Sequence, residues 1–238
     1  TDNLGNYMSY SYDDAGNKTR EDIRDPQGAL RKYLDFEYDQ FNRVNKIKNP
    51  DNSYSAISYD ANGNRSLMMT VPDNISTSYL YDELNRLKTV VQAEGAPQEA
   101  RTEYDYDAHD NLTMVKDAEG KVTSYTYDDF GRVTAITSPD TGSTEYTYDE
   151  AGNVKTKTDA KGVIVSYEYD ALNRLTRIDF PEEPDVIYSY DEADVQNGAG
   201  RMTTVTDASG TTRYDYDERG SVIEQRATIG SANYVARY

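Results

Sequence analysis

Apolar and polar residues follow each other in short segments that predict β-strands joined by tight turns. Residues 143–148 read Ser-Thr-Glu-Tyr-Thr-Tyr, so two tyrosines stand two positions apart and share one face of a strand. Residues 132–137 are rich in β-branched side chains, which also favour a strand. Residues 139–142 and 149–152 carry the Pro, Asp and Gly of turns. The pattern therefore predicts two strands, each of about six to eight residues, that pair as an antiparallel hairpin.

This unit recurs along the whole chain. A phrase resembling Tyr-x-Tyr-Asp occurs ten times at intervals of 21 to 26 residues, which is typical of a repeat architecture. The tyrosines that end the phrase are Tyr12, Tyr38, Tyr59, Tyr81, Tyr106, Tyr127, Tyr148, Tyr169, Tyr190 and Tyr216. The aspartates that follow them are Asp13, Asp39, Asp60, Asp82, Asp107, Asp128, Asp149, Asp170, Asp191 and Asp217. We predict one continuous array over residues 1–238, cut from a longer array at both ends.

The residue three positions after most of these aspartates is one that tolerates a positive φ angle. It is glycine at Gly16, Gly63, Gly131, Gly152 and Gly220, and Asn or Asp at Asn42, Asn85, Asn173 and Asp110. The aspartate itself can accept a hydrogen bond from the backbone two residues further on, as expected in a type I hairpin turn. Four other turns, at residues 25–28, 117–120, 159–162 and 207–210, read Asp-x-x-Gly. We interpret the aspartates as turn formers, with calcium binding as the alternative.

The two strands of a repeat differ in how their apolar residues are spaced. Pairs in the first strand, such as Val44 and Ile47 or Val133 and Ile136, are three residues apart. That spacing places the pair on opposite faces of a regular strand. Either a β-bulge after the turn returns both residues to one face, or both faces are partly apolar. The bulge is the favoured prediction, because a residue with positive φ directly precedes this strand.

A sheet of about twenty strands accumulates twist, so we predict that it curves or spirals. Its two free edges would invite pairing with further strands. One turn departs from the pattern, because residues 192–200 form an insertion before the next strand begins. Turns are where insertions are best tolerated.

Composition alone favours a disordered protein. The chain has a net charge of -18 and few Leu, Ile, Val and Phe residues, as disordered proteins do. Its 23 tyrosines supply the missing apolar surface, and they recur in register, so we predict a folded array. The acidity argues against nucleic acid and anionic membranes as partners, and it favours cationic ones.

The chain shows no pattern of catalytic chemistry. It lacks cysteine, its single histidine, His109, stands in a turn, and no nucleophile elbow, zinc motif or P-loop is present. Acidic residues are plentiful but show no pairing typical of acid–base catalysis. We therefore predict no catalytic, cofactor-binding or metal-binding residue and no enzymatic activity.

Two stretches carry a resemblance to a known family. Residues 125–133 read Tyr-Thr-Tyr-Asp-Asp-Phe-Gly-Arg-Val, and residues 167–175 read Tyr-Glu-Tyr-Asp-Ala-Leu-Asn-Arg-Leu. Together with the other copies, they resemble the Rhs/YD-repeat family of polymorphic toxins, insecticidal toxin complex C components and teneurins. The resemblance implies an all-β fold of antiparallel hairpin repeats in one long curved or spiralling sheet, part of an Rhs-type shell. The autocleaving core motif and the variable toxin domain of that family have no counterpart here.

The function implied by this resemblance is structural. We expect a wall segment that contacts neighbouring Rhs repeats and encapsulates or presents a C-terminal passenger such as a toxin domain. The expected location is secreted or at a bacterial cell surface. The alternative is an adhesion or carbohydrate-binding surface, on which tyrosine rings would stack against sugars. Tyrosines that face inward would argue against this alternative.

Overall fold

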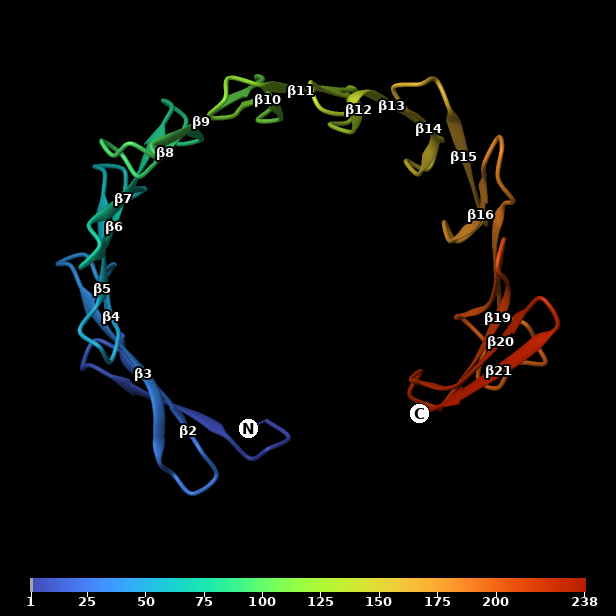
Figure 1. Ribbon diagram of the computed structural model, residues 1–238, viewed down its shortest axis with the longest axis horizontal. Helices are drawn as coiled ribbons and strands as arrows, with labels where there is room; N and C mark the ends of the chain where they lie inside the picture. Colours follow the sequence, from blue (N-terminus) through green and yellow to red (C-terminus); the bar gives the residue numbers. More distant parts are fainter. Residues whose placement is uncertain (1) are drawn as a thin grey trace. The chain divides into compact units, whose positions relative to one another are not determined.

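The computed structural model describes residues 2–238, which contain 21 β-strands and no helix. The chain forms two compact units, Thr1–Val122 and Thr123–Tyr238. Within each unit, strands that follow each other in the sequence lie next to each other and pair antiparallel (Figure 1). The predicted all-β fold of hairpin repeats is confirmed. With no helix present, no described segment could cross a membrane as one.

The first unit contains the strands up to β10. They are β1 (Tyr7–Tyr12), β2 (Lys18–Arg24), β3 (Leu30–Tyr38), β4 (Val44–Lys48), β5 (Tyr54–Tyr59), β6 (Arg65–Val71), β7 (Ile75–Tyr81), β8 (Leu87–Gln92), β9 (Ala100–Tyr106) and β10 (Leu112–Lys116). The odd-numbered strands end in the tyrosine of a Tyr-Asp pair. The even-numbered strands begin directly after the turn that this pair opens.

The second unit continues the same alternation. Its strands are β11 (Val122–Tyr127), β12 (Val133–Ser138), β13 (Gly142–Tyr148), β14 (Val154–Thr158), β15 (Ile164–Tyr169), β16 (Leu175–Asp179), β17 (Val186–Tyr190), β18 (Met202–Asp207), β19 (Gly210–Tyr216), β20 (Val222–Ile229) and β21 (Ala232–Arg237). The predicted strands at 132–137 and 143–148 correspond to β12 and β13 within one residue at each end.

A β-bulge follows each Tyr-Asp turn, and it explains the three-residue spacing of apolar residues. Tyr127 pairs with Val133, whereas Thr126 pairs with Ala135, so the intervening Thr134 has no partner of its own. Ile136 then pairs with Tyr125. Because Tyr125 and Tyr127 share a face, Val133 and Ile136 share that face too. The register confirms the bulge.

The bulges give the sheet two different faces, shown here for the second unit. One face carries the tyrosine pairs together with Val133, Ile136 and their equivalents. The opposite face is polar and carries cross-strand hydroxyl contacts, such as Thr147 to Thr156, whose oxygens are 2.5 Å apart. Since the sheet is a single layer, few side chains are fully buried, and cohesion comes mainly from strand pairing and cross-strand contacts.

The insertion at residues 192–200 folds against the end of β19, the second strand after it. The Gln196 amide donates to Asp215 Oδ1 over 3.1 Å, and the Tyr216 amide donates to the Gln196 carbonyl over 3.1 Å. Val195 of the insertion and nearby Thr203 are buried. The insertion therefore shields the end of β19 instead of projecting into solvent.

Candidate functional site: the Tyr-Asp turn ladder

The turns that follow the Tyr-Asp pairs are built by the aspartate side chain. In the turn at Asp128, Oδ1 accepts hydrogen bonds from the amides of Phe130 (2.9 Å) and Arg132 (3.0 Å). The Gly131 amide donates to the Asp128 carbonyl, and the Asp128 amide donates to the Arg132 carbonyl, both over 3.0 Å. The predicted bond from the residue two positions on is confirmed. The same pattern recurs at Asp13, Asp39, Asp60, Asp82, Asp107, Asp170 and Asp217.

The residue three positions after the aspartate has the left-handed backbone that the sequence predicts. The φ angle is 85° at Gly16, 89° at Gly63, 74° at Gly131, 91° at Gly152 and 89° at Gly220. At the non-glycine positions φ is 58° for Asn42, 63° for Asn85, 66° for Asp110 and 61° for Asn173. These residue types are present because others would be strained there.

The second carboxylate oxygen of the aspartate binds the side chain four residues on. This partner alternates between Asn and Arg from one turn to the next. Asn153 Nδ2 donates to Asp149 Oδ2 over 3.0 Å, and Arg174 Nε donates to Asp170 Oδ2 over 2.7 Å. The asparagines of this kind are Asn17, Asn64, Asn111 and Asn153, and the arginines are Arg43, Arg86, Arg132 and Arg174. We call these the Asn-type and Arg-type turns.

These contacts also lower the pKa of the aspartates. The Asn17 side-chain amide holds the pKa of Asp13 below its ordinary value, and Arg132 does the same for Asp128. At Asp170 the backbone amide of Arg174 is the main cause of the lowered pKa. The charged carboxylate is therefore the form that the turn stabilises.

Each turn type also reaches the next repeat, in its own way. Asn64 Nδ2 donates to Asn85 Oδ1 over 2.9 Å, and Asn153 Nδ2 donates to Asn173 Oδ1 over 3.0 Å. An Arg-type turn instead places its guanidinium beside the next tyrosine ring. The distance to the ring centre is 4.3 Å from Arg43 to Tyr59 and 4.4 Å from Arg132 to Tyr148.

Several left-handed residues contact the turn before them. Arg43 Nη1 would lie 3.7 Å from a Cβ atom added at Gly63, and Arg132 Nη1 would lie 3.6 Å from one added at Gly152. After three of the four Asn-type turns the left-handed position holds an amide acceptor, Asn42, Asn85 or Asn173. Within each unit, the alternation of Asn-type and Arg-type turns gives a ladder with a period of two repeats.

In seven of the Tyr-Asp motifs the final tyrosine ties its own Tyr-Asp hairpin to the hairpin before it. Its hydroxyl donates to the backbone carbonyl of the residue that opens the preceding even-numbered strand. The bonds, 2.5 to 3.0 Å long, run from Tyr38 to Lys18, Tyr59 to Val44, Tyr81 to Arg65, Tyr106 to Leu87, Tyr148 to Val133, Tyr190 to Leu175 and Tyr216 to Met202. Burial raises the pKa of several of these tyrosines, including Tyr148 and Tyr190.

Removal of one such hydroxyl should weaken one junction only. We expect Tyr148→Phe to cost about 1 kcal/mol, because the Val133 carbonyl loses a hydrogen bond while the ring still packs. Amides of β12 and β13 should then exchange with deuterium roughly fivefold faster. Tyr146→Phe is the matched control, since its hydroxyl has no hydrogen bond among residues 2–238. Equal effects of the two substitutions would contradict the assigned role.

The aspartates of the ladder do not assemble into a metal centre in the described part of the chain. Residues 2–238 contain no group of three or more His, Cys, Asp and Glu side chains placed to hold an ion. His109 lies in the turn after Asp107, where its amide donates to the Asp107 carboxylate over 2.8 Å. Calcium binding finds no support in this geometry, because the turns use both oxygens of their aspartates.

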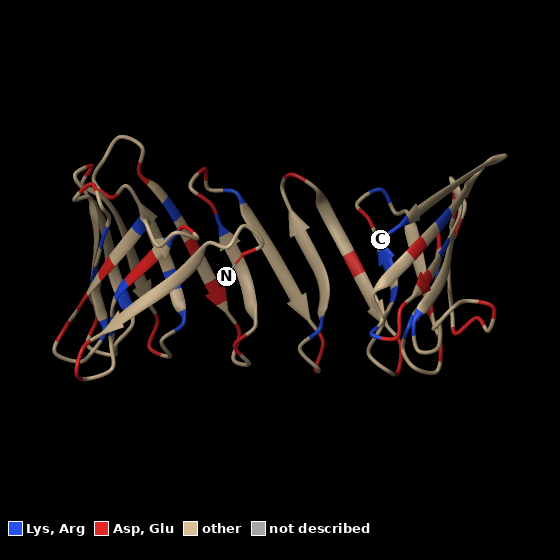
Figure 2. Ribbon diagram, turned by 90° about the horizontal axis from the view of Figure 1, so that it is seen from below, with Lys and Arg blue, Asp and Glu red and all other residues tan. Residues whose placement is uncertain are grey.

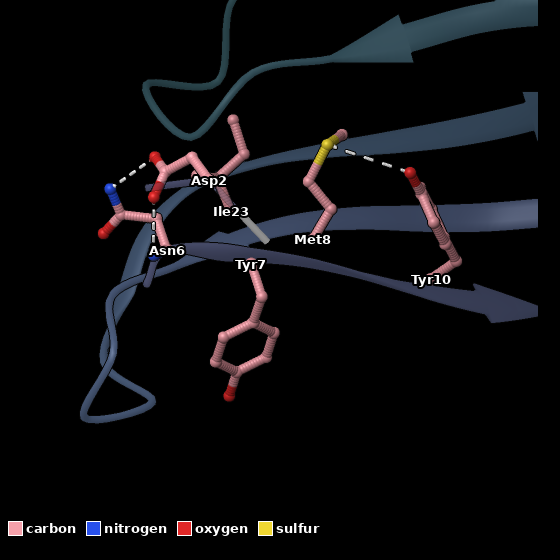
Figure 3. A pocket seen from close by; sticks show the side chains of 6 residues that line it. All are labelled: Asp2, Asn6, Tyr7, Met8, Tyr10 and Ile23. Atoms are coloured by element: carbon pink, nitrogen blue, oxygen red, sulfur yellow. Dashed lines mark hydrogen bonds between the residues drawn. The ribbon is translucent and has the colours of Figure 1, made fainter. Parts of the chain in front are cut away.

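A separate pocket of about 520 Å³ lies on β1, the first strand of the array. It is lined by Asp2, Asn6, Tyr7, Met8, Tyr10 and Ile23 (Figure 3). Met8 and Tyr10 rise from one face of the strand, whereas Tyr7 points to the other. Asn6 already satisfies the Asp2 carboxylate through its backbone and side-chain amides, at 2.9 and 2.8 Å. The pocket offers aromatic and apolar surface together with the hydrogen-bonded side chains of Asp2 and Asn6. Its lining contains no pair of residues suited to acid–base catalysis.

Comparison with known sequences assigns the repeat. The RHS Repeat family model matches residues 81–121, 106–144, 128–164, 148–182 and 197–228, which together make up more than half of the chain. The chain belongs to the RHS repeat family. One curated relative is the tRNA3(Ser)-specific nuclease WapA of Bacillus spizizenii, 29% identical over 153 aligned residues. That match covers 56% of this chain and 6% of the relative.

Solved structures with the same fold belong to toxin complexes. The crystal structure of TcdB2-TccC3-Cdc42 matches with a TM-score of 0.73 and 17% identity over 98% of this chain and 14% of the other. A Tc holotoxin pore of Photorhabdus luminescens matches with a TM-score of 0.72 and 20% identity over 93% of this chain and 13% of the other. The likeness confirms the Rhs-type fold. This RHS repeat segment spans a small part of the proteins that it matches.

Sequence reasoning found the turn residues of the ladder but missed its contacts between repeats. The hydroxyl bond of Tyr148 and the stacking of Arg132 both join residues of successive Tyr-Asp hairpins. One readable signal was the alternation of Asn and Arg four residues after the aspartates. It indicated that neighbouring repeats differ in a regular way.

Proposed function

We propose that this RHS repeat segment is part of the wall of a shell that encloses or presents a C-terminal passenger such as a toxin domain. The observation that carries the proposal is the turn ladder. Each repeat bonds its own turn and also the next repeat, so the segment is built as a continuous wall. Its family and its likeness in fold to structures of toxin complexes support the same role.

In this role the segment performs no chemical step. The aspartates and arginines of the turn ladder are engaged in turns, and we propose that the segment is not an enzyme and needs no cofactor. A passenger-carrying shell of this family would act outside the cell that makes it, so we propose a secreted or cell-surface location. Neighbouring Rhs repeats and the passenger would be its partners.

The proposal is tested on the full-length protein that contains this segment. We expect electron microscopy to show a hollow particle, and limited proteolysis to leave the passenger intact while the particle is closed. A passenger released by mild denaturation should become sensitive to the same protease. If particles are solid, or the passenger is digested as fast in the native protein as after denaturation, the segment does not form an enclosing wall.

A carbohydrate-binding surface is the second candidate, and the pocket on β1 favours it. Tyr10 is 47% exposed and rises from the same face of β1 as Met8, and Asp2 and Asn6 line the same pocket. An exposed tyrosine ring near carboxylate and amide groups is suited to a sugar ring. A glycan array read with the wild-type segment and with Tyr10→Ser tests this candidate, and Tyr7→Ser, on the opposite face, is the control. The candidate fails if the array is silent or if Tyr10→Ser gives the same signal as the wild type.

A further inference from the structure

The Arg-type turns differ from the Asn-type turns at their tips. Two residues after the aspartate, the Arg-type turns carry Phe41 and Leu84 in the first unit and Phe130 and Leu172 in the second. These large apolar side chains are 66% to 83% exposed. The Asn-type turns carry Ala15, Asn62, His109 and Ala151 at the same position. In each unit, large apolar tips therefore alternate with small or polar ones.

The tips of one unit lie along a single edge of its strands. Every Tyr-Asp turn joins an odd-numbered strand to the next even-numbered one, so antiparallel pairing brings these turns to the same edge. Successive large tips are four strands apart, which corresponds to about 19 Å at the usual spacing between strands.

The turn holds each apolar tip in a fixed position. The Leu84 amide donates to Asp82 Oδ1 and the Leu172 amide donates to Asp170 Oδ1, over 2.9 and 2.8 Å. The ring of Phe130 also lies beside the Arg132 guanidinium, at 5.0 Å. Exposed apolar side chains on a rigid turn lose little entropy on binding, which is typical of interaction surfaces.

A shallow pocket lies beside one of these tips. It measures about 420 Å³ and is lined by Tyr81, Asp82, Glu83, Leu84, Arg86 and Lys88. Leu84 supplies apolar surface, and the Arg86 guanidinium is already bound to Asp82, with its Nε 2.7 Å from Asp82 Oδ2. A partner side chain could rest against Leu84 here.

The charges of this edge define the chemistry of the partner. The residue directly after the turn aspartate is acidic at Asp14, Glu83, Asp129, Glu150, Glu192 and Glu218, and it is Gln or Ala in the other four turns. Glu83, Asp129 and Glu150 form no ion pair among residues 2–238. The arginines of the same turns are neutralised by their aspartates. Figure 2 shows acidic residues in many turns as well as along some strands.

We propose that the turn edge of each unit docks a basic polypeptide segment that carries large apolar side chains. The edge is defined by Phe41, Leu84 and the acidic Glu83 in the first unit, and by Phe130, Leu172 and the acidic Asp129 and Glu150 in the second. The apolar tips would contact its apolar residues, and the free carboxylates would pair with its lysines or arginines. A second copy of this chain would present the same acidic edge and be repelled. Nucleic acid and anionic membranes are disfavoured for the same reason.

The test uses a labelled peptide of alternating lysine and leucine, and a matched peptide of lysine and serine. Binding to the 238-residue chain is followed by fluorescence anisotropy. We expect the lysine–leucine peptide to bind more tightly, and to lose about tenfold or more in affinity when all four tips are changed to serine, since each tip adds apolar contact. The variant is F41S/L84S/F130S/L172S. Its matched control, on the Asn-type turns, is A15S/N62S/H109S/A151S, which should bind as the wild type does.

A second variant tests the charges. Glu83→Gln/Asp129→Asn/Glu150→Gln should weaken binding of the lysine–leucine peptide and reduce its dependence on salt. The proposal is overturned if the peptide does not bind, if both tip variants behave alike, or if a glutamate–leucine peptide binds equally well. Binding of a labelled second copy of the chain, lost in the tip variant, would assign the edge to contacts between copies and would also overturn it.

Discussion

Acidification below pH 3.8 should unfold the repeat array. We expect this although protonation first reduces the net charge of -18 that the chain carries at pH 7, and with it the repulsion between acidic side chains. The reason is the turn ladder, in which hydrogen bonds from Asn17 and Arg132 hold the pKa of Asp13 and Asp128 below the ordinary 3.8. A group whose pKa is lower in the folded state stabilises the fold above its unfolded pKa. That stabilisation is lost as the pH falls through the folded pKa. Far-ultraviolet circular dichroism against pH gives the measurement.

Salt separates this cause from general charge repulsion. As the carboxyls become protonated in acid, the 25 Lys and Arg residues repel each other. About 0.5 M sodium chloride screens charges more than roughly 4 Å apart, but it cannot return a protonated aspartate to the acceptor role that its turn requires. We therefore expect the acid transition in high salt as well, at about the same pH as in low salt. Recovery of the sheet on addition of salt would show that repulsion, and not the turns, governs the acid transition.

The parts of this fold that could be predicted are those encoded within one repeat. A positive φ angle strongly favours Gly, Asn or Asp, so Gly131 and Asn173 marked their turns directly. The bulge could be predicted from Val133 and Ile136. These residues are three positions apart, whereas the tyrosines opposite them are two positions apart, so both pairs can lie on one face only if one residue of the first strand is left unpaired. Both signals are local and repeat along the chain.

The missed contacts depend on which atom of one Tyr-Asp hairpin meets which atom of the next hairpin. The carbonyl that accepts from Tyr148 belongs to Val133, which is accessible only because the bulge and the second turn of the repeat set the register. Neither the tyrosine nor the valine indicates this partner from its residue type alone. The packing of residues 192–200 on β19 was also unpredictable, since it depends on the particular fit of Val195 and Thr203. The exposed apolar tips, by contrast, follow from the sequence once turn types are distinguished.

Gly210→Ala should unfold the hairpin of β19 and β20 locally. Gly210 has φ of 144°, and a Cβ atom placed on it would lie 1.9 Å from the Thr228 carbonyl oxygen and 3.0 Å from its carbon. Gly210 pairs with Ile229, so the collision falls within the strand pairing itself and cannot be relieved by turning a side chain. We expect a cost of about 3 to 5 kcal/mol, from backbone strain and steric overlap together.

Gly162→Ala separates these two contributions. Gly162 closes another Asp-x-x-Gly turn with φ of 82°, but nothing lies within 4 Å of an added Cβ atom, so this variant bears backbone strain alone, about 1 to 2 kcal/mol. Hydrogen exchange should show protection lost across β19 and β20 in Gly210→Ala and only a modest change near residue 162 in the control. Because a repeat array is held together mainly by contacts between neighbours, amides of β12 and β13 should be unaffected by Gly210→Ala. If both variants lose protection to a similar extent, the backbone at Thr228 moves aside at little energetic cost. If protection falls uniformly throughout the second unit, its repeats unfold together.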